Sequence, residues 1–415
     1  MKVFKFGGAS VKDISGVENV AIILQSFPRI PVVVVISAMG KTTNSLEKIL
    51  NQFRDQSDYT GELISLKHFH ARIICGLFPD EHPVFQMVDD LFREMESRLK
   101  SARPYDEVYD QVVSYGELLS TVIVHQYLLF KKLSAEWLDA RDYIFTDNTF
   151  REGKVDWART CSAINGIKST LQQNNITITQ GFIGRAENGL TTTLGRDGSD
   201  FTAAIFASCM EAESVTIWKD VPGVMNSDPK KLSNVSVFSE LPFQEAAEMT
   251  YYGASVIHPK TIRPLATRGI PLYVKSFDDI TLPGTKIHEC HIEELPPLIV
   301  FKENQCLISC KVTDYTFITE EHLRQVFSIL TELNIRINVM QNSAISFSFC
   351  IDFRASKLKA LLARLQPDFE VYYNTGLTLI TVKNYDTETF EFYRRKPGLL
   401  LEQSSRSTLQ VLLRM

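Results

Sequence analysis

A lysine inside a short strand-forming stretch, followed at once by two glycines, is the first group in this sequence that could do chemistry. Residues 3–6 favour a β-strand, Lys5 lies within it, and Gly7 and Gly8 come next. Glycines let the backbone turn sharply and expose its N–H groups, because no Cβ blocks a ligand. Such amides beside an ammonium group suit a phosphate, so the stretch predicts a phosphate site. The same residues would also make a tight turn with a solvated lysine.

A second reactive stretch, residues 191–200, places an arginine and two aspartates between glycines. The planar guanidinium of Arg196 can hold a carboxylate through two hydrogen bonds, and the glycines permit a ligand to come close. Ser199 or Asp200 can start the apolar helix predicted over residues 201–210. The alternative is a capped turn with an internal arginine–aspartate pair.

Two further places carry candidate charges. Glu117 opens a helix predicted over residues 117–130, where a carboxylate is also simply favourable with the helix dipole. Residues 219–230 form the turn-rich exit of a strand predicted over 215–218, and parallel sheets bind ligands at such strand ends.

The elements that must position these groups alternate between strand and helix. Strands are predicted over 31–36, 135–140, 176–180 and 271–276, and helical periodicity runs through 60–99. We expect the first helix to begin near residue 11 with Ser10 as its N-cap. The alternation indicates an α/β fold with a mostly parallel sheet between helices.

Size and charge restrict the class of protein. A chain of 415 residues exceeds one ordinary core, and a net charge of −5 without a long basic run argues against nucleic acid as a partner. The start lacks the apolar core of a signal peptide, and no apolar run approaches the roughly 20 residues that span a bilayer. We expect a soluble, cytoplasmic protein with a small-molecule partner and no membrane contact.

The seven cysteines include no Cys-x-x-Cys pair, so the sequence indicates neither a zinc ribbon nor a disulfide framework, and we expect mostly buried, reduced thiols. Residues 288–291 read His-Glu-Cys-His, which is faintly metal-like but has no second half in the sequence. The sequence therefore predicts no metal site. His258 precedes a proline and is interpreted as a structural histidine.

The composition changes at residues 293–297, which we interpret as a domain boundary. Beyond it the predicted order is strand, helix, strand, strand, helix, strand, which is the ferredoxin-like order. Residues 377–414 look like a second, shortened copy. A repeated module in a tail favours regulation over further active site.

Four segments, taken together and in this order, resemble the aspartokinase family: residues 5–11, 114–120, 194–200 and 218–224. The resemblance covers almost the whole chain. It implies an amino-acid kinase catalytic domain over 1–295, a first ferredoxin-like ACT domain over 296–375 and a second, shortened ACT domain over 376–415.

The resemblance implies transfer of the γ-phosphoryl group of ATP, with Mg²⁺, to the side-chain carboxylate of L-aspartate. Lys5 and Asp200 would be catalytic. Glu117 would take the substrate ammonium group and Arg196 its α-carboxylate, and Thr43 and Ser199 would add substrate contacts. The nucleotide contacts would be Lys5, Phe6, Gly7, Gly8, Lys219, Asp220, Met225, Lys230, Ser255 and Val256.

The ACT resemblance implies feedback regulation by an amino acid, lysine or threonine, in a homodimer that pairs through these domains. The effector contacts would be Thr313, Phe317, Asn338, Val339 and Gln341.

Two positions depart from the family pattern. Ala9 replaces the usual threonine after the glycine pair, and Ser255 replaces a position that is often lysine. A non-catalytic amino-acid sensor on the same fold is therefore one alternative, and a kinase for another small substrate, such as glutamate or a nucleoside monophosphate, is a second. From the chain length we expect no fused homoserine dehydrogenase.

Overall fold

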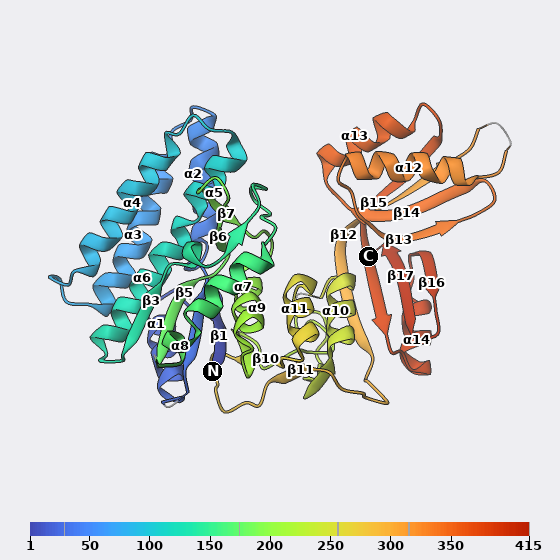
Figure 1. The fold of residues 1–415 in the computed structure, drawn as a ribbon. Coiled ribbons are helices and arrows are strands. Elements are labelled where there is room, and N and C mark those ends of the chain that lie inside the picture. The colour runs from blue at the N-terminus through green and yellow to red at the C-terminus, as the bar shows by residue number, and fades with distance from the viewer. Residues whose placement is uncertain (29, 174, 255–256, 314–315, 415) are drawn as a thin grey trace. The chain divides into compact units, whose positions relative to one another are not determined.

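The structure of the chain is a computed structural model that describes residues 1–415 except 29, 174, 255–256, 314–315 and 415 (Figure 1). It divides into two compact units. The first comprises Met1–Val224, Val237–Ala247 and Val256–His291, and the second comprises Met225–Ser236, Glu248–Ser255 and Ile292–Met415. Each unit is described by itself.

An eight-stranded sheet forms the centre of the first unit, with the order β3-β5-β2-β1-β8-β10-β11-β9. The six strands from β3 to β10 are parallel, and β11 is antiparallel to β10. The predicted mostly parallel α/β sheet is thereby confirmed. The strands are β1 (Lys2–Phe6), β2 (Val32–Ile36), β3 (Ala135–Leu138), β5 (Ile176–Gln180), β8 (Ser214–Lys219), β9 (Glu240–Pro242), β10 (Leu272–Ser276) and β11 (Thr285–His288).

Strand β2 has the composition of a strand in the interior of a parallel sheet. All five of its residues, Val-Val-Val-Val-Ile, are buried, as expected for a strand that is covered on both faces. A three-stranded sheet, β4-β6-β7, lies in the same unit and is built from β4 (Phe145–Thr146), β6 (Ile183–Ala186) and β7 (Thr191–Thr193).

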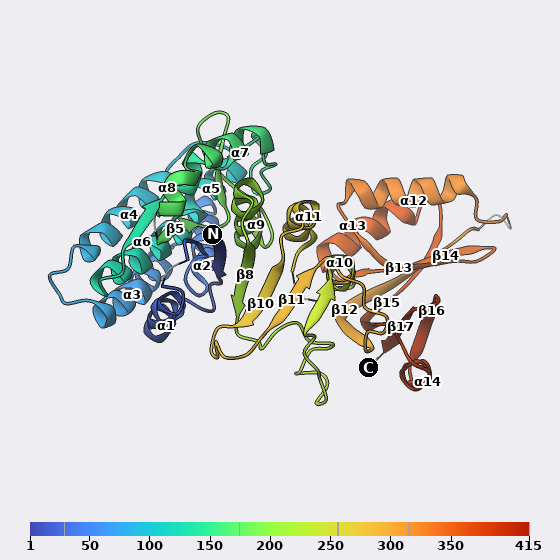
Figure 2. The ribbon, with the colours of Figure 1, turned by 60° about the horizontal axis from the view of Figure 1, so that its bottom comes forward.

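Helices α2 to α6 pack side by side in the first unit, and α6 and α9 pack against the central sheet (Figures 1 and 2). The helices are α1 (Ile14–Gln25), α2 (Thr42–Arg54), α3 (Thr60–Leu77), α4 (Val84–Leu99), α5 (Tyr105–Val113), α6 (Tyr115–Phe130), α7 (Trp157–Gly166), α8 (Lys168–Gln173), α9 (Gly198–Met210), α10 (Phe243–Tyr252) and α11 (Pro259–Arg268). A 3₁₀ turn, η1, covers Ala140–Asp142. Among the described residues, no helix is long and apolar enough to cross a membrane.

The predicted start of the first helix was wrong. Helix α1 begins at Ile14, and its N-cap is Asp13, whose Oδ1 accepts a hydrogen bond of 2.9 Å from the N–H of Gly16. Ser10 instead belongs to the turn after β1, where its N–H donates to the carbonyl of Gly7 at 3.0 Å. An aspartate at the N-cap also brings a negative charge to the positive end of the helix dipole.

The second unit is built on a six-stranded antiparallel sheet with the order β13-β14-β12-β15-β17-β16. Its elements are β12 (Leu298–Lys311), α12 (Glu320–Glu332), β13 (Ile337–Asn342), β14 (Ser346–Asp352), α13 (Ala355–Leu365), β15 (Glu370–Lys383), α14 (Thr387–Arg394), β16 (Leu399–Ser404) and β17 (Thr408–Arg414). The run from β12 to β15 confirms the predicted ferredoxin-like order.

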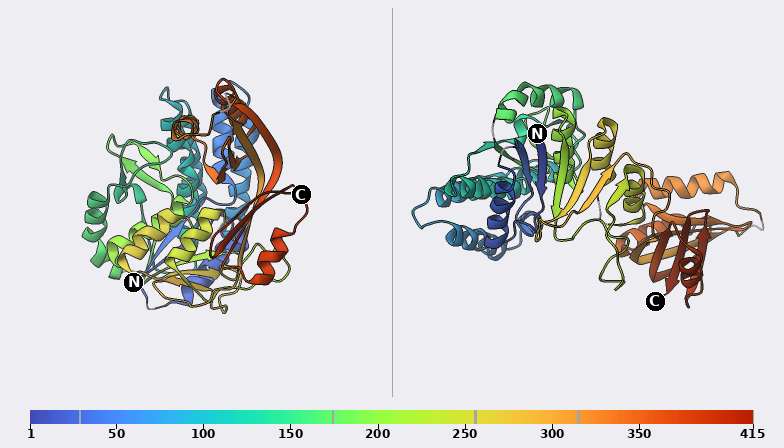
Figure 3. Two further views of the ribbon diagram at one scale, coloured as in Figure 1. Left: turned by 90° about the vertical axis from the view of Figure 1, so that its right-hand side faces the viewer. Right: turned by 90° about the horizontal axis from the view of Figure 1, so that it is seen from below.

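The sequence predicted a second copy that begins at residue 377, but the single strand β15 runs through that position without a break. In Figure 3 the long strands β12 and β15 run side by side, in orange and red. The two strands pair with each other along nearly their whole length. The pairing therefore continues from the first predicted copy into the second. The proposed ACT boundary after residue 375 thus lies inside a strand, and it stays a prediction.

Most of the cysteines are free thiols, as predicted, but two of them are paired. Cys161 of α7 and Cys209 of α9 form a disulfide. The other five cysteines, all among the described residues, are free, and three of them, Cys306, Cys310 and Cys350, are buried. Pairing depends on which helices are neighbours in space, and the spacing of 48 residues does not reveal that.

Candidate active site

Lys5 and Asp200 form a buried ion pair at the centre of the first unit. Lys5 lies near the end of β1, Asp200 lies in the first turn of α9, and Lys5 Nζ is 2.6 Å from Asp200 Oδ1. Their side chains are 11% and 6% exposed. Two buried charges of opposite sign compensate each other, whereas either alone would be costly to bury. The lysine and the aspartate that sequence reasoning selected are therefore neighbours.

Glu117 lies near the start of α6 and is 3% exposed. Its Oε1 accepts a hydrogen bond of 3.2 Å from the N–H of Ala38, while its Oε2 is buried and makes no hydrogen bond within the described part of the chain. Burial raises the pKa of Glu117 to about 8, although the Ala38 N–H and the charge of Lys5 act to lower it. A carboxylate of this kind can accept a ligand's ammonium group at the oxygen that has no partner.

The turn after β1 approaches the turn after β2 too closely for side chains. A Cβ on Gly8 would lie 2.6 Å from the carbonyl oxygen of Ala38, and the N–H of Gly40 donates to the carbonyl of Gly8 at 2.9 Å. Gly116 is equally tight, since its Cβ would lie 2.9 Å from the Ala38 Cβ. Glycines thus bring Lys5 and Glu117 to one end of the parallel strands.

The loop before α9 has strained backbone. Gly195 has φ +76° and Asp197 has φ +54°, a left-handed conformation that is uncommon for a residue with a side chain. Ser199 is buried next to Gly181, where an added Cβ would lie 2.4 Å from the Ser199 Cβ. Such conformations occur at functional sites more often than elsewhere.

Arg196, in contrast, is not brought to the buried pair. Its side chain is 81% exposed, and its Nε lies 3.7 Å from Asp197 Oδ2. The internal arginine–aspartate pair that the sequence left open is therefore present as a loose surface contact.

Lys219, the last residue of β8, adds a second cation near the pair. Burial lowers its pKa, the charge of Asp200 acts to raise it, and the charge of Lys5 lowers it further. Lys5, Lys219 and Asp200 thus interact electrostatically. The charges of Asp197 and Asp220 also act on Lys219, so the two ammonium groups lie among several carboxylates. A lysine in such a position can interact with a phosphate.

The remaining predicted site residues lie in different surroundings. Thr43 is half-buried in the first turn of α2, and Asp220 is exposed. The ring of Phe6 is buried and stacks on Trp218, so only its backbone is left for a ligand. Met225 and Lys230 belong to the second unit, and Ser255 and Val256 lie outside the described residues.

Sequence reasoning missed Asp110, a buried carboxylate of α5. Its Oδ2 accepts hydrogen bonds from the N–H groups of Arg151 and Thr193, and its Oδ1 accepts one from the Thr193 hydroxyl. Burial raises its pKa to about 6, and these three bonds act to lower it. Asp110 therefore fixes β7 just before the loop that carries Arg196. An aspartate in a stretch that is mostly apolar apart from Gln111, residues 108–113, was the available signal.

In the second unit, the predicted effector residues differ in exposure, and Asn338 is half-buried. Asn338 accepts from Lys302 Nζ at 2.7 Å and donates to Gln305 Oε1 and to Asp352 Oδ1, so its amide is already engaged. Val339 is part of the core. The others, Thr313, Phe317 and Gln341, are exposed.

Comparison with known proteins places this site in a class. Residues 1–276 match the model of the amino acid kinase family. This range covers most of the first unit and contains Lys5, Glu117 and Asp200. The chain therefore belongs to the amino acid kinase family.

Several similar proteins are aspartokinases. The lysine-sensitive aspartokinase 3 of Escherichia coli is 30% identical over 397 residues, which cover 92% of this chain and 87% of that protein. Two crystal structures of E. coli aspartokinase III, one with lysine and aspartate in the T-state and one with aspartate and ADP in the R-state, each give a TM-score of 0.83. They are 27% and 28% identical, and each alignment covers 100% of this chain and 96% of the other. The particular enzyme is thus an aspartokinase.

Proposed function

We propose that this aspartokinase transfers the γ-phosphoryl group of ATP to the side-chain carboxylate of L-aspartate, giving 4-phospho-L-aspartate, at the site built from Lys5, Glu117 and Asp200. The observation that carries the assignment of residues is the buried Glu117 Oε2, which has no hydrogen bond within the described residues and lies in the same site as the Lys5–Asp200 ion pair. An amino acid supplies the ammonium group that this oxygen requires.

The chemistry needs charge and position more than it needs a base. The side chain of aspartate has a pKa of about 3.9, so the nucleophile is ionised at neutral pH without help from the protein. The obstacle is to bring that carboxylate to a triphosphate. Lys5 and Lys219 supply positive charge, and Asp200 holds the Lys5 ammonium in place at 2.6 Å.

The amides of the turn formed by Gly7 and Gly8 bind phosphate oxygens, since no side chain shields them. Arg196 recognises the α-carboxylate of aspartate, and its exposed position means that it must fold over the substrate to do so. Thr43 and Ser199 complete the substrate contacts.

Asp220, Met225, Lys230, Ser255 and Val256 are proposed nucleotide contacts only through the family resemblance.

Mg²⁺ fits this site as part of Mg·ATP and not as an ion caged by protein carboxylates. Asp200 is already paired with Lys5, and Asp197 and Asp220 are exposed. Mg²⁺ commonly binds substrate phosphates and keeps several waters, and when bound it offsets negative charge on the transferring group.

The test is a coupled assay with ATP and aspartate on the wild type, on Lys5→Ala, and on Lys100→Ala as an exposed-lysine control. We expect Lys5→Ala to lower kcat about 100-fold or more with a smaller change in KM, because the lost charge acts mainly on the transition state. Thermal unfolding curves show whether the variant is folded. An unchanged kcat in folded Lys5→Ala contradicts the role of Lys5, and a wild type without turnover favours the amino-acid sensor.

We also propose that lysine is the feedback effector and that the enzyme is a homodimer. The support is the similarity to E. coli aspartokinase III, whose structure contains lysine, together with the exposed Gln341 on the edge strand β13. An unpaired edge strand is a ready surface for a second chain.

A further inference from the structure

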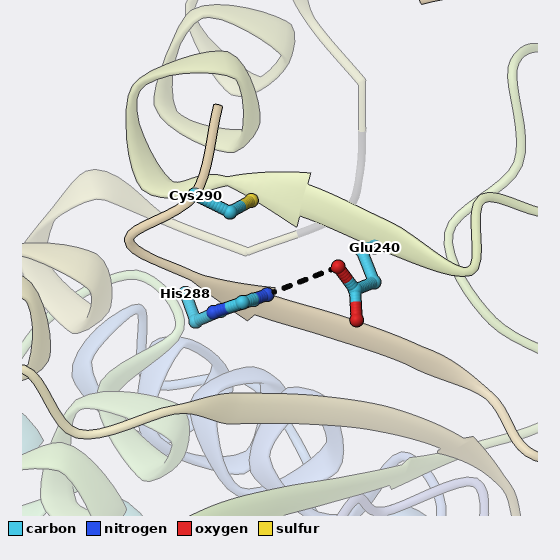
Figure 4. Close-up of side chains that lie close together, drawn as sticks. All are labelled: Glu240, His288 and Cys290. Atoms are coloured by element: carbon cyan, nitrogen blue, oxygen red, sulfur yellow. Dashed lines mark ion pairs between the residues drawn. The ribbon is translucent and has the colours of Figure 1, made fainter. Parts of the chain in front are cut away.

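Three side chains that bind zinc in other proteins converge at one corner of the first unit. Glu240 comes from β9, His288 is the last residue of β11, and Cys290 follows two residues later. One ligand atom from each lies within 4.8 Å of the other two. Figure 4 shows all three side chains pointing into the same space beside the strands.

Strand pairing explains why they meet. β9 and β11 are parallel neighbours in which Glu240 is paired with Lys286 and Pro242 with His288. Alternate residues of a strand face the same side, so His288 and Lys286 of β11 lie on the face of the sheet that also carries Glu240 of β9. Cys290 continues that spacing of two residues beyond the end of the strand.

His288 Nε2 is the decisive atom. It is buried and makes no hydrogen bond to any described residue, although it lies 3.3 Å from Glu240 Oε2. With metal–nitrogen and metal–oxygen bonds of about 2.0–2.1 Å, two ligands of a tetrahedral zinc ion are about 3.3 Å apart. The histidine and the glutamate are therefore already spaced as a metal would hold them.

We propose that Glu240, His288 and Cys290 form a binding site for Zn²⁺ or a chemically similar divalent ion. Imidazole nitrogen, thiolate sulfur and carboxylate oxygen are all ligands of zinc, and a water would occupy the fourth position. Binding requires Cys290 Sγ to move inward by about 1 Å and to release its proton. Two further charges act on Cys290: Lys286, which opposes a cation, and Glu289, which favours one.

The expected consequence is a cross-link at the edge of the large sheet. β9 has only three residues and a single neighbour, β11. Both metal-binding segments also lie within a few residues of points where the chain passes from the first unit to the second. A shared ion would hold this edge strand in place.

The test uses the full chain, stripped of metal with a chelator and then titrated with Zn²⁺ in calorimetry and with Co²⁺ in absorption spectroscopy. We expect one equivalent of zinc per chain, and with Co²⁺ the ligand-field bands of a tetrahedral site together with a thiolate-to-metal charge-transfer band. Zinc should also raise the Tm of the wild type, because the ion binds the folded state.

The variants are Cys290→Ser, His288→Gln and the nearly isosteric Glu240→Gln, with Cys75→Ser as the control for an exposed cysteine elsewhere. Each of the three should weaken zinc binding at least about 10-fold and remove the rise in Tm, whereas Cys75→Ser should behave as the wild type. Kinase activity and circular dichroism report folding. Absence of stoichiometric binding, or equal binding by folded Cys290→Ser and wild type, overturns the proposal.

Discussion

Glu117 should make aspartate binding depend on pH. Its pKa is raised to about 8 in the ligand-free protein, so at pH 7 most of it is protonated, whereas a substrate ammonium group needs the carboxylate. We expect kcat/KM for aspartate to fall by about tenfold per pH unit below 8, because this ratio reports the ionisation of the free enzyme. The measurement is kcat/KM between pH 6 and 9 for the wild type and Glu117→Gln. Glu117→Gln should be weaker and nearly independent of pH, and an equal slope in both proteins contradicts the assignment.

The same residue fixes the sign of a stability change. The folded-state pKa of about 8 lies above the ordinary value of 4.5, so the folded protein holds the extra proton between these two pH values. The free energy of unfolding should therefore fall as pH rises through that window and stay constant above it, for the ligand-free chain. Glu117→Gln removes this contribution.

Arg196 provides a test of substrate recognition. Arg196→Lys keeps the charge but loses the planar fork, so it cannot form two parallel bonds to a carboxylate. One lost charge-assisted hydrogen bond of about 1.5–3 kcal/mol corresponds to an aspartate KM that is about 10–150 times higher. Steady-state kinetics with each substrate varied in turn measure this. The ATP KM should change little, and if it rises instead, Arg196 contacts the nucleotide.

At the scale of elements, α9 links the active site to the disulfide. Its first turn carries Ser199 and Asp200, and near its other end Cys209 is bonded to Cys161 of α7. The disulfide closes a loop of 48 residues, for which the loop-entropy model gives a stabilisation of about 4 kcal/mol.

We therefore expect reduction with dithiothreitol to lower the Tm of the wild type and to leave Cys161→Ser unchanged. Cys161→Ser should itself unfold at the temperature of the reduced wild type. Thermal denaturation with and without reductant measures the effect, and thiol titration counts the free cysteines in each protein. Seven reactive thiols in the unfolded, non-reduced wild type would show that the bond does not form.

At the scale of the whole molecule, regulation requires that effector and substrates influence each other's binding. An effector inhibits only if it binds the inactive state more tightly, and by linkage its own affinity must fall when ATP and aspartate are bound. We expect lysine to inhibit the kinase and to bind more weakly in calorimetry when both substrates are present. Inhibition assays with lysine, threonine and methionine identify the effector, and the absence of binding and inhibition by all three removes the regulatory proposal.

A matched pair of variants places the effector on the sheet of the second unit. Gln341 lies on the edge strand β13, and Gln403 lies on the opposite edge strand, β16; both are exposed. Losing one hydrogen bond of about 1 kcal/mol should raise the lysine concentration for half-inhibition about fivefold in Gln341→Ala and leave Gln403→Ala unchanged. Analytical ultracentrifugation of both variants shows whether the dimer is preserved.

The sequence by itself determined the class of fold and most of the chemistry. A short apolar run of β-branched residues, such as the valines of β2, predicts a strand because the pattern is local. The glycine pair after Lys5 predicts a tight turn, and at Gly8 the structure leaves no room for a Cβ. The order of elements in the tail was also readable, since each element carries its own pattern. The contact of Lys5 with Asp200 could not be predicted from the sequence, because 195 residues separate them and only the folded sheet brings β1 next to α9.

What only the tertiary structure decided are pairings between distant side chains and their environments. Burial raises the pKa of Glu117, and its Oε2 makes no hydrogen bond within the described chain. The residue type alone predicts neither property. The disulfide requires α7 to lie beside α9. The metal-like run at 288–291 had no second half in the sequence, and Glu240 supplies it because β9 and β11 pair in register. Such contacts depend on which segments become neighbours, and the whole chain fixes that when it folds.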